Sequence, residues 1–103
     1  MAYSVILEDP AVFDLQSILL YITKTLKEPA VAEKIYRTIK AKINTLDENL
    51  QRCKLVDMQP FHAMGVRRLF AENYSVFFAI NEKTKSVHVL RVLYSRREWQ
   101  GLL

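Results

Sequence analysis

The side chains most suited to chemistry lie in the last two-fifths of the chain, where basic residues outnumber acidic ones. Residues 1–60 carry eight basic and eight acidic side chains, which cancel. Residues 61–103 carry three acidic and seven basic side chains, and the basic ones are Arg67, Arg68, Lys83, Lys85, Arg91, Arg96 and Arg97. Arginine can bind a phosphate or a carboxylate through two parallel hydrogen bonds. The cluster is therefore either a solvated basic face or a surface for a polyanion or an acidic protein.

Other residue types exclude several classes of function. The single cysteine, Cys53, allows no internal disulfide and no cysteine-based zinc site, and we expect it to be inert. Two glycines are too few for a P-loop or a dinucleotide-binding motif. We expect no metal, no cofactor, no membrane span and no signal peptide. The expected setting is the reducing cytoplasm.

The first half of the chain must supply elements that position these side chains. Residues 3–8 favour a strand, and Asp9-Pro10 predicts a helix start with Asp9 as N-cap. Apolar residues then recur every three or four positions as far as residue 26, which predicts an amphipathic helix. Residues 25–28 break this pattern, and Pro29 begins a second helix whose apolar stripe reaches residue 50. The short connection makes the two helices an antiparallel hairpin.

The second half of the chain has the pattern of a sheet. Residues 66–71, 74–80 and 87–94 are rich in β-branched and aromatic side chains, with polar turns between them. Strict alternation places Val89, Arg91 and Leu93 on one face of the last strand and His88, Val92 and Tyr94 among those on the other. Residues 51–65 give no clear pattern. The prediction is one α+β domain over residues 1–103, with a helical hairpin on one face of a sheet that ends in a three-stranded meander.

Three segments of the second half resemble the RelE/ParE toxin superfamily. They are Gly65-Val66-Arg67-Arg68-Leu69-Phe70, Asn73-Tyr74-Ser75-Val76-Phe77-Phe78, and Val87-His88-Val89-Leu90-Arg91-Val92-Leu93-Tyr94-Ser95-Arg96-Arg97-Glu98. The order strand, helix, helix before them is similar too, so the resemblance covers nearly the whole chain.

The resemblance implies the toxin half of a bacterial type II toxin–antitoxin module, neutralised by a cognate acidic antitoxin that wraps around it. Operator DNA would be reached only through that antitoxin. RelE-like members cut mRNA on the ribosome, whereas ParE-like members have the same fold and poison DNA gyrase. A degenerate member would keep only antitoxin binding.

The candidate catalytic residues apply only to a nuclease. Cleavage of RNA without a metal needs a base, an acid and cationic donors. Arg67, Arg91 and Arg97 could supply charge, and Tyr94 stands where many relatives carry histidine. Arg91 interrupts an apolar strand, so it either belongs to the active surface or faces solvent or a carboxylate.

A second set of residues is expected to bind the target or the antitoxin. It comprises Arg68, Arg96, Trp99, Leu102 and Leu103. Only Lys54 stands near the strand of Arg67, whereas RelE-like nucleases often use lysines there. His62 and His88 are treated as bystanders. The thin lysine complement favours ParE-like action slightly over mRNA cleavage.

Overall fold

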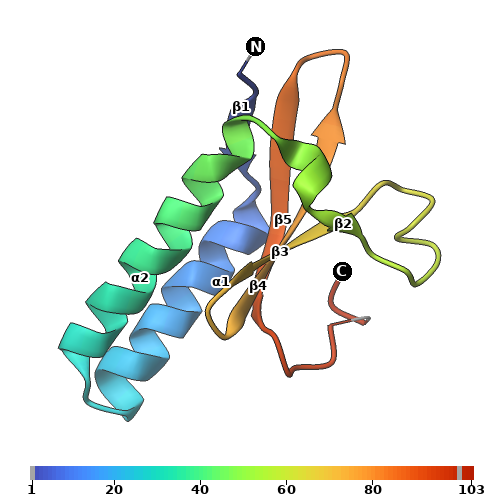
Figure 1. Ribbon diagram of the computed structural model, residues 1–103. Helices are drawn as coiled ribbons and strands as arrows, with labels where there is room; N and C mark the ends of the chain where they lie inside the picture. The colour runs from blue at the N-terminus through green and yellow to red at the C-terminus, as the bar shows by residue number, and fades with distance from the viewer. Residues whose placement is uncertain (1, 100) are drawn as a thin grey trace.

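The computed structural model describes residues 2–99 and 101–103. It confirms an α+β fold in which two helices lie side by side on one face of a five-stranded sheet (Figure 1). The strands are β1 (Ser4–Leu7), β2 (Lys54–Leu55), β3 (Arg67–Ala71), β4 (Tyr74–Asn81) and β5 (Ser86–Tyr94). The helices are α1 (Asp9–Leu20) and α2 (Pro29–Asn44).

The sheet has the order β1-β5-β4-β3-β2 and is antiparallel except for one pair. β1 runs parallel to β5, with Ser4 opposite Ser86 and Leu7 opposite Val89. β3, β4 and β5 form the expected meander. β2 is a two-residue strand inside the segment that had no clear sequence pattern, and it pairs only with Arg67 and Arg68 at the start of β3.

The helical hairpin follows the apolar pattern, with differences at its ends. A π-helical turn, Tyr21–Thr25, extends α1, and short 3₁₀ turns follow α2. Asp9 is the first helical residue rather than the N-cap, which is Glu8. The Glu8 side chain makes no capping bond, because its carboxylate instead accepts a hydrogen bond from His88 Nδ1 at 2.8 Å. A tertiary contact therefore replaced the local capping bond.

The two faces of the sheet pack against different partners. On the helix side, a large core joins both helices to side chains such as Phe78, Val89 and Val92. On the opposite side, a smaller cluster holds Phe77 and Leu93. Figure 1 shows the chain end after β5 turning back beside the sheet, on the side away from the helices.

Strict alternation along β5 was a wrong expectation, because the ladder between β4 and β5 contains a register shift. Phe77 lies opposite Arg91 but Phe78 lies opposite Val89, so Leu90 has no partner. A β-bulge of this kind adds one residue to one strand and reverses the inside–outside pattern beyond it. As a result Val89 and Val92 share the helix-side core, while Leu93 joins the other cluster.

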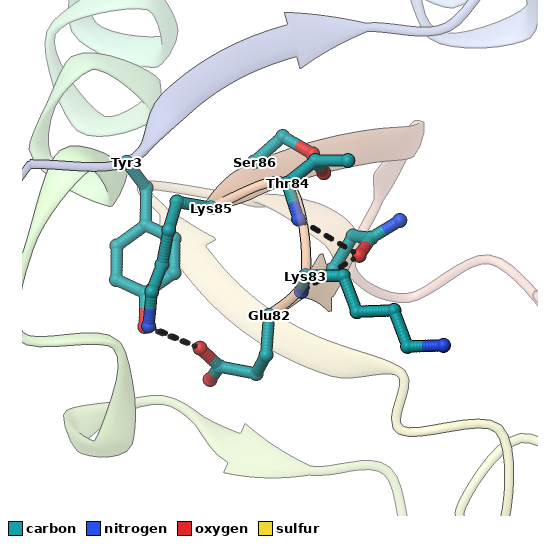
Figure 2. A network of polar contacts seen from close by, with 7 residues as sticks. Tyr3, Glu82, Lys83, Thr84, Lys85 and Ser86 are labelled. Carbon is teal, nitrogen blue, oxygen red and sulfur yellow. Dashed lines mark hydrogen bonds and ion pairs between the residues drawn. The ribbon is translucent and has the colours of Figure 1, made fainter.

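The end of the sheet beside the β4–β5 turn is fastened by a polar cluster that includes Tyr3. Figure 2 shows the Tyr3 hydroxyl and the Lys85 ammonium directed at the carboxylate of Glu82. The Tyr3 hydroxyl donates to Glu82 Oε1 at 2.8 Å, and Lys85 Nζ donates to the same oxygen at 3.1 Å. These contacts hold Tyr3, which lies just before β1, against the turn between β4 and β5. They therefore support the pairing of β1 with β5.

Candidate functional site: two arginines and an edge groove

Arg91 is bound internally and holds α1 to the sheet. Its Nε and Nη2 donate to the two carboxylate oxygens of Asp14 at 2.7 and 2.8 Å, and its Nη1 donates to the Leu102 carbonyl at 2.5 Å. The backbone N–H of Val92 donates to the same carboxylate at 3.0 Å. Asp14 is buried, and its hydrogen bond raises the pKa of Arg91. Of the two alternatives for Arg91, the structure shows the carboxylate partner, supplied by a helix.

Arg68 lies on β3 and is surrounded by aromatic rings. Its guanidinium carbon is 4.6 Å from the ring centroid of Phe70, 5.3 Å from that of Phe77 and 5.8 Å from that of Trp99. Cations are attracted to aromatic faces at such distances. Burial among these rings lowers the pKa of Arg68.

The hydrogen bonds of Arg68 go to neutral acceptors only. Nε donates to Ser75 Oγ at 2.9 Å and Nη2 donates to the Ser95 carbonyl at 3.3 Å. The two serine hydroxyls lie 2.9 Å apart. Within residues 2–99 and 101–103, no carboxylate forms an ion pair with Arg68. Its charge is thus partly desolvated without being balanced.

A groove of about 750 Å³ opens beside Arg68, between β2, β3 and Trp99. Its apolar walls come from Leu55, Met58, Phe70 and Trp99. The segment around β2 completes this groove, and only the short run Lys54-Leu55-Val56 marks its strand in the sequence. Phe70 and Met58 were therefore missed as candidates, although more than half of Phe70 is exposed.

Two other candidate catalytic residues, Arg67 and Tyr94, make contacts of their own. Arg67 alternates with Arg68 along β3, and its Nη1 donates to the Cys53 carbonyl at 2.6 Å. Tyr94 is partly exposed at the end of β5, where its ring meets Tyr74 edge-on with centroids 5.8 Å apart. Tyr74 packs against the helix-side core, so Tyr94 lies across the sheet from Arg68.

The predicted binding residues near the chain end do contact one another. Trp99 packs on Phe77 with ring centroids 5.0 Å apart, and Leu102 and Leu103 are partly buried on the same cluster. Arg96 and Arg97 lie in the exposed turn after β5. The chain end is thus an apolar flap over the second face of the sheet, with two exposed arginines at its start.

The hydrogen-bonded chain Ser86–His88–Glu8 has the order of a hydrolytic triad. Ser86 Oγ is 3.0 Å from His88 Nε2, and His88 Nδ1 is 2.8 Å from Glu8 Oε2. Ser86 is buried, however, and its hydroxyl also contacts Thr84 Oγ1 at 2.6 Å. A nucleophile needs space for a substrate beside it. We therefore infer that these contacts serve a structural role and help to hold β1 against β5.

Two further observations limit the chemistry of the described residues. Among residues 2–99 and 101–103, no group of three or more His, Cys, Asp or Glu side chains is arranged to hold a metal ion. Cys53 is buried, and burial raises the pKa of its thiol. What the described groove offers is cations, aromatic rings and an open sheet edge, which suit binding better than proton transfer.

The family described as "ParE toxin of type II toxin-antitoxin system, parDE" matches residues 5–99 of this sequence. The chain belongs to this family. The match spans both helices and all five strands, so it includes the groove, Arg68 and Arg91. The expected membership of the RelE/ParE superfamily is confirmed.

Solved structures share the fold. The chromosomal ParDE system of Pseudomonas aeruginosa matches with a TM-score of 0.73 at 23% identity, covering 90% of this chain and 96% of the other. The RelBE2 toxin–antitoxin complex of Mycobacterium tuberculosis matches with a TM-score of 0.63 at 18% identity, covering 91% and 99%.

A RelE–RelB complex of Pyrococcus horikoshii matches with a TM-score of 0.61 at 18% identity, covering 95% and 100%. A comparison with curated protein sequences gives no match. Because ParE and RelE proteins share this architecture, the fold of this ParE-family toxin does not decide its cellular target.

No helix in the described part of this ParE-family toxin is long and apolar enough to cross a membrane.

Proposed function

We propose that this ParE-family toxin inhibits growth by binding DNA gyrase, and that a cognate acidic antitoxin neutralises it. The observation that carries the proposal is that two of the candidate nuclease arginines are engaged inside the protein. Arg91 is neutralised by Asp14, and Arg67 donates to the Cys53 carbonyl. An RNA-cleaving site needs an acid or base near its cations, since proton transfer contributes about 10²–10⁴-fold in rate.

The surface for gyrase would include the exposed Arg96 and Arg97 of the turn after β5. Neither forms an ion pair within residues 2–99 and 101–103. Free guanidinium groups beside an apolar flap suit a large protein partner with acidic side chains. The antitoxin partner is supported by the neighbouring structures, which are toxin–antitoxin complexes.

The test is a short pulse of toxin expression with separate measurements of translation, mRNA cleavage and DNA supercoiling, followed by a supercoiling assay with purified gyrase. We expect the purified toxin to block supercoiling and to leave mRNA intact. Arg97→Ala should abolish growth inhibition, whereas Lys83→Ala, in the β4–β5 turn, should not.

Tyr94→Phe separates the two mechanisms, because it removes a hydroxyl and keeps the ring. A gyrase inhibitor should tolerate the change, since no proton moves. If wild-type toxin cleaves mRNA on ribosomes and Tyr94→Phe stops that cleavage, the protein is a RelE-like nuclease and the gyrase proposal is wrong. A protein that neither inhibits growth nor blocks supercoiling would be a degenerate member.

A further inference from the structure

The outer face of α1 carries large apolar side chains where a surface helix usually carries charge. Phe13 is 68% exposed and Leu20 is 57% exposed. They are seven residues apart, which is two helical turns, so they lie on the same face. The only charged side chain in residues 10–23 is Asp14, which is buried against Arg91. A helix that is apolar on all sides is normally buried, so this face of α1 is suited to burial in an assembly.

Opposite charges stand at the two ends of this apolar face. Asp9 lies four residues before Phe13, and Lys24 lies four residues after Leu20, in the π-helical turn that continues α1. Both charged side chains are exposed. Neither forms an ion pair among residues 2–99 and 101–103. The face therefore has the order acid, apolar, apolar, base along the helix.

This order is self-complementary when two copies of the helix run antiparallel. Phe13 and Leu20 lie at equal distances on either side of the midpoint between positions 16 and 17, and so do Asp9 and Lys24. A two-fold axis at this midpoint places Phe13 of each copy opposite Leu20 of the other. The same axis places each Asp9 opposite a Lys24. A parallel alignment would instead set Asp9 against Asp9, so the charges select the antiparallel arrangement.

We propose that α1 is the interface of a symmetric homodimer, with its outer face packed antiparallel on the α1 of a second copy. The face from residue 9 to residue 24 is about 24 Å long. A pair of helices of this length buries less than the roughly 1,200 Å² at which stable interfaces begin, so the dimer is transient, with a dissociation constant in the micromolar range. Figure 1 shows the chain end on the side of the sheet away from the helices, so the dimer leaves that side free.

The experiment is sedimentation velocity of the purified full chain over a wide range of concentrations. We expect wild type to pass from monomer to dimer as its concentration rises. Phe13→Ala should weaken association about a hundredfold or more, because central aromatic contacts carry much of the binding energy and a two-fold interface contains each contact twice. Leu20→Ala should act in the same direction.

Charge reversal tests the register of the two helices. Asp9→Lys and Lys24→Asp should each weaken association about tenfold, since each places like charges together at both ends of the interface. The double variant should associate like wild type, because it restores both opposite pairs. A mixture of the two single variants should form a heterodimer for the same reason. Rising salt should reduce all of these differences.

Matched controls lie away from α1. Phe70→Ala removes an exposed aromatic ring on β3, and Lys83→Asp reverses an exposed charge in the turn between β4 and β5. Both should associate like wild type. Thermal melting checks that every variant folds.

The outcomes separate this inference from the proposed function. A wild-type chain that stays monomeric, or a dimer that Phe13→Ala and the charge reversals leave unchanged, would overturn the homodimer. A monomer whose binding to the protein of the neighbouring reading frame is weakened by Phe13→Ala would also overturn it, because the antitoxin would then cover α1. A chain that dimerises through α1 but does not block supercoiling would support the homodimer and overturn the gyrase proposal.

Discussion

The two faces of the sheet bury their side chains in different ways. The helix side is covered by α1 and α2, and its one buried acid, Asp14, is satisfied by three hydrogen bonds from Arg91 and Val92. The opposite side is covered by a short flap and carries Arg68, whose acceptors are all neutral. Arg91 and Asp14 form a charged pair that fixes α1 to the sheet, whereas the charge of Arg68 is not balanced by an acid among the described residues.

The comparison shows how the same residue type acquires two roles. Arg68 lies on β3 and Arg91 on β5, with β4 between them, yet of the two only Arg91 meets a carboxylate among the described residues. A buried ion pair that is complete stabilises only modestly, but losing one partner is costly. An arginine without an acid, in contrast, costs little to alter in the free protein and much in a complex.

The largest expected effects come from truncating the phenylalanines on the two faces. Phe77 and Phe78 are neighbours, and both are fully buried. Each Phe→Ala change should reduce the free energy of unfolding by about 3–5 kcal/mol. We expect Phe78→Ala, under two helices, to cost more than Phe77→Ala, because the flap can collapse into the space that Phe77 leaves. Urea unfolding followed by circular dichroism measures both, and the reverse order would break the comparison.

The charged pair comes next. Arg91→Ala should reduce the free energy of unfolding by about 3 kcal/mol, because it leaves Asp14 buried without its partner. Asp14→Asn should cost less, since a neutral amide replaces the carboxylate. Combining Arg91→Ala with Asp14→Asn should cost less than the sum of the single changes. Strict additivity in this double-mutant cycle would show that the pair does not couple α1 to β5.

The flap should contribute less than either core. Trp99→Ala removes a partly buried ring from Phe61, Phe77 and Arg68. A fully buried aromatic ring costs about 3–5 kcal/mol on truncation, so we expect about 2 kcal/mol here. The same variant should widen the groove beside Arg68, because Trp99 lines it. A loss as large as that of Phe78→Ala would mean that the flap belongs to the main core.

The smallest effect is expected at the exposed cluster of Tyr3, Glu82 and Lys85. The hydrogen bond from Tyr3, and then that from Lys85, lowers the pKa of Glu82, while the bond to Glu82 raises the pKa of Tyr3. The Glu82 contribution is present above the unfolded carboxyl pKa of about 4.3 and is lost as pH falls through the lower folded value.

The Tyr3 contribution has the opposite sign with pH. It is present below the unfolded pKa of about 10 and is lost as pH rises through the higher folded value. Glu82→Gln should therefore lower the melting temperature slightly at neutral pH and match wild type at pH 3. A difference between the two proteins that persists at pH 3 would assign the effect to packing.

The fold could be predicted well because its main signals are periodic. The apolar residues repeat every three or four positions along α1 and again along α2, and the repeat breaks at the connection between them. The three segments rich in β-branched and aromatic residues correspond to β3, β4 and β5. β2 escaped prediction because two residues show no period, and their pairing with β3 depends on a tertiary contact. The bulge at Leu90 was equally hidden, because nothing local marks where a strand gains one residue.

The candidate site was predicted in part. Arg68, Trp99, Leu102 and Leu103 do share one face of the sheet. The sequence does contain a sign of the partner of Arg91. Asp14 is an acid inside the apolar stripe of α1, between Ala11 and Ile18. A charge in such a position is tolerated only when it is paired. Phe70 could not be identified, because its exposure depends on β2 ending at Leu55.

The parallel pairing of β1 with β5 makes completion of the sheet a late event in the synthesis of the domain. β5 lies between β1 and β4, so the sheet has a gap in its middle until residues 86–94 have been made. Contacts between segments so far apart in sequence form late and slowly. β1 leaves the ribosome early, but it cannot pair until β5 has been made. Folding of the domain is therefore delayed until its translation is nearly finished.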